Sequence, residues 1–112
     1  MFKKQYVALA STLMLGMAAV SGSAQAADEE AALKIAQASN CMACHSVDAK
    51  LVGPAWREVG KKYADDTEAK AKLTAKVKDG GKGVWGEIPM PPNPTVSDAD
   101  LGTMVDFILT LK

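Results

Sequence analysis

The 112-residue chain is poor in the side chains that build metal clusters and disulfide frameworks, with two cysteines and one histidine. This supply argues against a structural zinc site, because such a site takes four ligands. Aromatic residues are also scarce, at 5% of the chain. A small domain buries only a modest share of its surface, so a core with so few large side chains favours a prosthetic group in its middle.

The chain has no excess charge of either sign, with 13 basic and 13 acidic residues. This balance gives no reason to expect nucleic acid or an anionic membrane surface as a partner. An apolar run long enough to cross a bilayer is also lacking. The stretch from Val7 to Val20 has 14 uncharged residues, whereas a spanning helix needs about 20. We therefore expect no stable membrane association.

The amino-terminal residues instead have the pattern of a secretory signal peptide. Two lysines precede the apolar stretch, and residues 24–26 (AQA) have the A-x-A form of a signal-peptidase site. The sequence predicts a cleaved leader of residues 1–26 and one exported domain of residues 27–112. Cleavage one residue later, after Ala27, is the alternative.

Apolar residues spaced three and four apart predict four helices in this domain and no strand, hence an all-α fold. The predicted helices cover residues 28–39, 55–64, 67–78 and 97–111. Asp28 is the expected N-cap of the first, and Pro54 the expected first residue of the second. Gly80 is expected to stop the third, and Ser97 with Asp100 resembles a capping box for the last.

The segment between the third and fourth predicted helices, residues 80–96, has four prolines and four glycines and is neither helix nor regular strand. A connection of this length inside a small domain is usually functional or disordered. Its apolar residues argue against disorder: Val84, Trp85, Ile88 and Met90. We expect a functional loop.

Both cysteines and the histidine stand together in CMACH, residues 41–45. C-x-x-C-H is the attachment signature of c-type haem. Two intervening residues let one turn of backbone present the thiols of Cys41 and Cys44 to two vinyl groups at one haem edge. The adjacent His45 then lies under the ring as the proximal iron ligand. A disulfide between Cys41 and Cys44 is the main alternative, because a thioredoxin-like pair would need a βαβ context.

The sixth iron ligand decides between a carrier and an enzyme. With no second histidine, a methionine thioether is the candidate. Met42 lies inside the attachment motif and Met104 in the apolar stripe of the last helix, whereas Met90 is stiffened by a proline on each side. We predict His45 and Met90 as axial ligands, hence a one-electron carrier and not an enzyme. The alternative is a haem protein with an open distal site, a small-ligand sensor or enzyme subunit.

Three more residues are candidates for contacts around the haem. The Pro54 carbonyl is placed to accept the other ring N–H of His45, since ligand histidines usually donate that proton to a carbonyl. Trp85 either packs on the haem edge with its N–H on a propionate or is an ordinary core aromatic. Asn93 either hydrogen-bonds near the sulfur of Met90 or holds the turn.

Together these motifs resemble the small bacterial class I monohaem cytochromes c, in particular the cytochrome c-551/c-552 type. The resemblance covers nearly all of the predicted domain and rests on CMACH, LVGPA, GVWGEIPMPPN and VSDADLGTMVDFILTLK. It implies a class I cytochrome c fold, about four short helices wrapped around one covalently attached haem c. It also implies thioether bonds at Cys41 and Cys44, the axial pair His45 and Met90, and periplasmic electron shuttling.

The chain departs from this family pattern at two places. The segment NPTVSD, residues 93–98, is slightly longer than in the shortest members, and Lys76 stands where some relatives have an arginine near the propionates. Eight lysines lie between residues 50 and 82. Those near an exposed haem edge would steer an acidic redox protein, the partner expected for a monomeric carrier.

Overall fold

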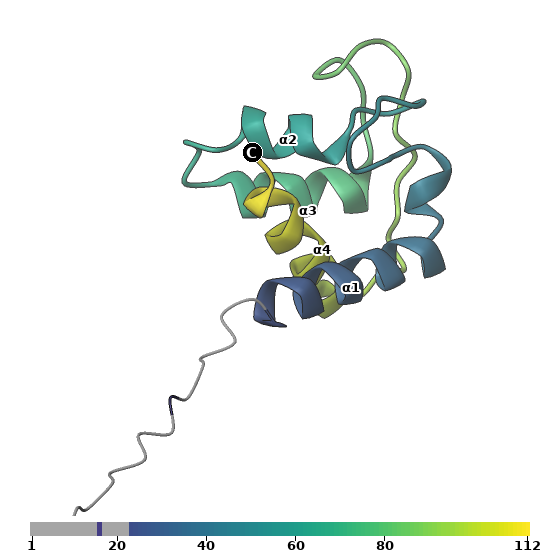
Figure 1. Cartoon of the computed structure of the whole chain (residues 1–112). Helices are drawn as coiled ribbons and strands as arrows, with labels where there is room; N and C mark the ends of the chain where they lie inside the picture. The colour runs from purple at the N-terminus through teal and green to yellow at the C-terminus, as the bar shows by residue number, and fades with distance from the viewer. Residues whose placement is uncertain (1–15, 17–22) are drawn as a thin grey trace, which may run out of the picture.

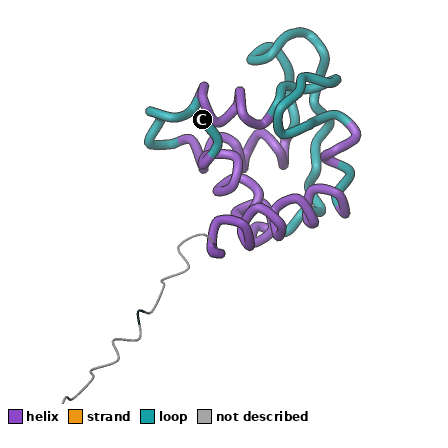
Figure 2. The backbone as a smooth tube through the Cα atoms, viewed as in Figure 1, coloured by secondary structure: helices purple, strands orange, loops and turns teal. Residues whose placement is uncertain are grey.

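The structure, a computed structural model, describes Gly16 and residues 23–112. The predicted leader therefore lies largely outside the described residues. The described part holds four α-helices and a short 3-10 helix: α1 (Ser23–Ala38), η1 (Cys41–Ala43), α2 (Trp56–Lys62), α3 (Ala69–Asp79) and α4 (Asp98–Thr110) (Figure 1). Figure 2 shows only helices and loops over these residues. The all-α prediction is confirmed.

The last helix, α4, is the element around which the others pack, and it contacts α1, α2 and α3. Leu101 is 0% and Val105 1% exposed, and burying such a side chain contributes about 1.5–3 kcal/mol. Ser97 caps the helix as predicted, because its Oγ accepts the N–H of Asp100 at 3.2 Å. The whole predicted stripe is buried: Leu101, Met104, Val105, Ile108 and Leu111.

α1 presents small side chains to this core. Ala32 and Ala36 are both 0% exposed, which allows a close approach of the helix axes. The start of α1 differs from the prediction: the helix begins at Ser23, so Asp28 lies inside it, exposed, and is not the N-cap. Residues 24–27 are alanine and glutamine, and their high helix propensity extends the helix upstream.

The other two helices are shorter than predicted. The first residue of α2 is Trp56 and not Pro54, and the N-cap is Ala55, whose backbone is extended. α3 begins two residues late, at Ala69. In the turn before it, Asp66 Oδ1 accepts the N–H of Glu68 at 2.8 Å, a local bond that competes with helix. α3 ends at Asp79, directly before the predicted stop at Gly80.

Candidate functional site

A cavity of about 460 Å³ is lined by residues from four parts of the chain: 41–59, 73–77, 81–91 and 101–108. Its volume lies within the range of about 300–1,000 Å³ found for ligand and cofactor pockets. The cavity brings together the CMACH motif and Met90, which the sequence predicted to meet. Its apolar walls come from α2, α3 and α4: Trp56, Val59, Leu73, Val77, Leu101, Met104, Val105 and Ile108.

One backbone turn presents the residues of the attachment motif. Asn40 ends α1 in the left-handed conformation (φ 61°), which asparagine tolerates better than most residues. The N–H groups of Cys44 and His45 then both donate to the carbonyl of Cys41, at 3.2 and 3.0 Å. Cys41 and Cys44 form no disulfide with each other. Burial raises the pKa of the Cys41 thiol.

The imidazole of His45 is oriented from two sides. Its Nδ1 lies 2.8 Å from the carbonyl oxygen of Pro54, the contact expected from the sequence. A carbonyl can only accept, so Nδ1 carries the proton and Nε2 keeps a free lone pair. The ring also packs against Trp56, with centroids 6.3 Å apart. The imidazole is thus held in the tautomer that can bind a metal through Nε2.

The backbone after the motif is bonded to the start of α2. The first N–H groups of a helix have no partner within it, and here the residues after His45 supply the acceptors. This pairing explains why α2 begins at Trp56 and not at Pro54. The pairing consists of two bonds, Trp56 N–H to Ser46 O (2.9 Å) and Arg57 N–H to Val47 O (3.0 Å). A third bond, from Gly53 N–H to Cys44 O (2.8 Å), lies within the segment before α2.

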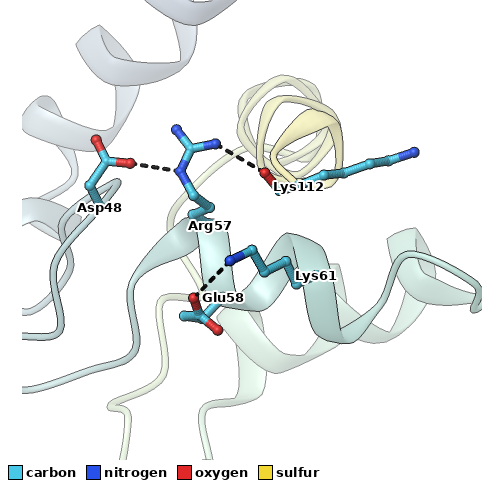
Figure 3. Close-up of polar contacts among 5 residues, drawn as sticks. All are labelled: Asp48, Arg57, Glu58, Lys61 and Lys112. Atoms are coloured by element: carbon cyan, nitrogen blue, oxygen red, sulfur yellow. Dashed lines mark hydrogen bonds and ion pairs between the residues drawn. The ribbon is translucent and has the colours of Figure 1, made fainter.

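The side chain of Arg57 extends this connection (Figure 3). Its Nε donates to Asp48 Oδ1 at 2.7 Å, and its Nη1 donates to the carbonyl of Lys112 at 3.3 Å. One guanidinium therefore joins the segment after the attachment motif to the residues that follow α4. No local pattern in the sequence indicates this contact, because the three residues are brought together only by the packing of the fold.

Gly53 lies directly against the imidazole. A Cβ atom at this position would be 2.6 Å from Cε1 and 3.0 Å from Nδ1 of His45. No residue with a side chain fits there unless the ring moves. The sequence contained this glycine within LVGPA, but its contact with His45 was not predicted.

Met90 is held by its backbone at the end of α3. Its N–H donates to Gly81 O at 2.8 Å, and the N–H of Gly81 donates to Met90 O at 3.0 Å. This isolated bridge closes residues 81–90, here named the methionine loop. Residues 82–89 are all exposed. The loop is therefore fastened at its base, with most of its length in solvent.

Asn93 holds the chain that leaves the methionine loop. Its backbone N–H donates to Val77 O at 2.9 Å, and its Nδ2 donates to Pro91 O at 3.0 Å and to Val77 O at 3.4 Å. The Val77 carbonyl belongs to the last turn of α3, where carbonyls lack partners in the helix. Of the two roles considered for Asn93, these bonds correspond to holding the turn.

Trp85, in the methionine loop, lines the cavity but is 42% exposed. It is therefore not an ordinary core aromatic. The Nζ atom of Lys62, at the end of α2, lies 5.5 Å from the centroid of its ring, a contact that sequence reasoning missed. Lys76 also lines the cavity.

These residues fit a covalently attached haem. Two thiols lie on one turn, an imidazole offers Nε2, and a thioether lines the same apolar cavity. Met90 and Met104 both line the cavity, whereas Met42 does not. None of the helices in the described residues is both long and apolar enough to cross a membrane.

Comparison with known sequences also indicates a haem protein. Residues 29–112 match the family model for cytochrome c. Cytochrome c-552 of Nitrosomonas europaea is 48% identical over 101 residues, which cover 90% of this chain and 98% of the relative. Cytochrome c-551 of Pseudomonas aeruginosa is 43% identical over 105 residues, which cover 94% and 96%.

Solved structures agree with the sequence matches. The crystal structure of wild-type Nitrosomonas europaea cytochrome c552 matches with a TM-score of 0.69 and 52% identity, covering 71% of this chain and 99% of that chain. The class 1 cytochrome MtoD from Sideroxydans lithotrophicus matches with a TM-score of 0.64 and 33% identity, covering 75% and 96%. The resemblance seen in the sequence is confirmed: the chain belongs to the cytochrome c family and is an electron carrier with one covalently attached haem c, not an enzyme.

Proposed function

We propose that this chain is a periplasmic one-electron carrier with His45 and Met90 as the axial ligands of its haem iron and Cys41 and Cys44 as the thioether attachments. The observation that carries the proposal is the single apolar cavity that all four side chains line. When bound, the haem supplies a one-electron change between Fe(II) and Fe(III). The protein's own side chains hold the haem and set the environment of its iron.

His45 and Met90 set the electronic environment. Pro54 O accepts a hydrogen bond from His45 Nδ1, which leaves Nε2 for the iron. Met90 offers a soft, neutral sulfur, which favours Fe(II) and a high reduction potential. The apolar walls act in the same direction, because a low dielectric disfavours the extra charge of Fe(III). With both His45 and Met90 bound, the iron would have no position for a small molecule, as a carrier requires and an open-site protein does not.

Paired methionine variants test the sixth ligand, because Met104 lines the same cavity. Met104 is 3% exposed and belongs to the packed core, whereas Met90 lies in a loop. In Met90→Leu we expect loss of the long-wavelength ferric band of Met–Fe(III) bonding. We also expect a fall in potential by an appreciable part of the about 0.8 V that axial ligands span. Met104→Leu, a change of similar volume, should keep both.

Each other outcome of this experiment has a definite meaning. Loss of the band in Met104→Leu alone would assign the sulfur to Met104. A high-spin ferric spectrum in the unaltered protein would favour the open distal site, a sensor or enzyme subunit, over the carrier. Colour that is removed by acid-acetone extraction would contradict attachment through Cys41 and Cys44.

Export is the part of the proposal that rests on the leader. The leader would direct the domain to the compartment where haem c is attached, and its removal there would leave the Ala27–Ala38 part of α1. Mass spectrometry of the protein recovered from a periplasmic fraction should give the mass of residues 27–112 plus one haem. A mass that still includes residues 1–26 would contradict cleavage.

The surface around the cavity supports an acidic redox protein as partner, such as a reductase, oxidase, peroxidase or reaction centre. Three lysines line the cavity without an ion-pair partner among the described residues, whereas the ion-paired lysines lie outside it. Exposed apolar side chains line the same cavity: Val52, Val84, Trp85 and Ile88. The three lysines are Lys50, Lys76 and Lys82.

Such a surface steers association by charge, and its effect falls with ionic strength. Electron-transfer rates with an acidic redox protein should therefore decrease as salt increases, and Lys82→Gln should flatten this dependence. Lys70→Gln is the matched control, because Lys70 pairs with Asp106 at 3.0 Å outside the cavity. Light scattering of the isolated carrier should give the mass of one chain.

A further inference from the structure

The methionine loop is held at its base and at its tip, by contacts of different kinds. At its base, the bridge between Gly81 and Met90 joins its two ends. Within the loop, one further backbone bond runs from Gly83 N–H to Gly86 O, at 2.8 Å. That bond stays inside the loop and does not tie it to the rest of the molecule. The tip of the loop therefore needs another contact if it is to stay in place.

That contact comes from α2, which follows the segment carrying His45. The ammonium of Lys62 lies 5.5 Å from the ring centroid of Trp85, within the about 6 Å over which a cation is attracted to an aromatic face. Lys62 makes no ion pair within the described residues, so its charge is available to the ring. Its neighbour Lys61 is engaged differently and donates to Glu58 Oε1 at 3.3 Å.

We propose that Lys62 is a positioning residue that holds the tip of the methionine loop through Trp85 and thereby keeps Met90 in place. The inference rests on the proposed function in one respect, the bond between Met90 and the iron. The contact joins the end of α2, on the histidine side of the cavity, to the loop on the methionine side. Opening of the loop must break it, so its loss raises the fraction of time that the loop is open.

Two readouts follow the opening of the loop in the intact, haem-loaded protein. The first is the rate at which added imidazole binds the ferric protein, because imidazole must replace Met90. The second is hydrogen exchange of the Gly81 and Met90 amides, which form the base bridge and exchange only when it opens. The second readout does not depend on which side chain binds the iron.

In Lys62→Gln we expect both rates to rise by about two- to fivefold, which corresponds to the about 0.5–1 kcal/mol of an exposed cation–π contact. Lys62→Arg should restore rates close to those of the unaltered protein, because a guanidinium also lies well on an aromatic face. Lys61→Gln is the matched control, since it removes the same charge one residue away without touching Trp85. It should leave both rates unchanged.

A second pair of variants separates the contact from a general effect of charge. In a Trp85→Leu background, Lys62→Gln should have no further effect on amide exchange, because the ring is already absent. Equal rates for Lys62→Gln and Lys61→Gln, or full additivity with Trp85→Leu, would overturn the inference. If the unaltered protein lacks the Met–Fe(III) band, the assignment of Met90 fails, while amide exchange still decides the role of Lys62.

Discussion

Residues 44–57, which carry His45, and the methionine loop, residues 81–90, differ in how they are held. The histidine segment has backbone bonds to the first turn of α2, the Pro54 contact on the imidazole, and the bonds of Arg57 to Asp48 and Lys112. The methionine loop has a bridge at its base and one cation–π contact at its tip. One proposed ligand is thus held by a network of bonds, and the other by a bridge at the base of its loop and one contact at the tip.

This difference indicates which side of the proposed iron site opens more easily. Segments with few buried contacts and exposed backbone open at a lower free energy than packed ones. Residues 82–89 are exposed, whereas Trp56, behind His45, is 4% exposed. We expect the histidine to stay bound while the methionine side opens.

The largest loss of stability should come from a substitution that crowds the imidazole of His45. In Gly53→Ala, the new Cβ would lie 2.6 Å from Cε1 of His45, so the ring or the backbone must move. Overpacking of this kind typically costs about 1–3 kcal/mol. We expect a lower free energy of unfolding in urea and a changed midpoint potential, because the imidazole loses its position against Pro54.

The control for this change is a glycine of the methionine loop. Gly83 has a φ of 99°, and a Cβ there would meet no atom within 4 Å. Gly83→Ala should therefore cost only the backbone strain of a residue with positive φ, about 1 kcal/mol. If Gly83→Ala destabilised the protein more than Gly53→Ala, the two sides would not differ as described.

A smaller effect is expected where the chain leaves the methionine loop. Asn93→Ala removes the Nδ2 bonds to Pro91 and Val77 but leaves the backbone bond to Val77 O. Net hydrogen bonds contribute about 0.5–1.5 kcal/mol, and we expect this loss to appear mainly as faster amide exchange at Met90. Thr103→Val, which removes a side-chain bond within α4, should leave Met90 exchange unchanged. Equal exchange in both variants would remove Asn93 from the support of the loop.

A still smaller effect is expected for the Arg57 contact on the histidine side. Asp48→Asn weakens an exposed ion pair, with side chains 38% and 71% exposed, and such pairs contribute about 0–1 kcal/mol. The backbone bonds to α2 remain, so the midpoint potential should stay unchanged, and the loss of stability should disappear at high salt. Asp106→Asn, which breaks the exposed pair with Lys70, is the reference. A shifted potential in Asp48→Asn alone would show that the side chain holds the segment.

The contrast between the two sides also separates what the sequence could predict from what it could not. CMACH and the contact of His45 with Pro54 follow from local spacing and from the chemistry of a metal-ligating imidazole. The stripe and cap of α4 are local as well. The predicted starts of α1 and α2 were wrong for different reasons. Alanine-rich residues extend α1 upstream, and α2 begins where Ser46 and Val47 supply acceptors.

The contacts that sequence reasoning missed range from near neighbours, such as Gly53 with His45, to residues far apart in the chain. Lys62 with Trp85, Arg57 with Lys112, and the base bridge of the methionine loop depend on how the helices pack. Periodicity and motif spacing contain no information on such pairs. Met90 could be proposed from its flanking prolines, but the way its loop is held could not.

The smallest expected effect lies outside both segments and serves as their reference. A hydrogen bond from Lys72, helped by the N–H of Glu68, lowers the pKa of Asp66, which lies between α2 and α3. The contribution of a carboxylate with a lowered pKa is present above its unfolded value of about 3.9 and is lost as the pH falls through the folded value. Urea unfolding from about pH 6 to about pH 3 should therefore show a slightly smaller loss of stability in Asp66→Asn than in the unaltered protein. The midpoint potential at neutral pH should be the same in both, because Asp66 touches neither the histidine segment nor the methionine loop. A change in potential would mean that the linker between α2 and α3 also supports the site, in addition to the histidine segment and the methionine loop.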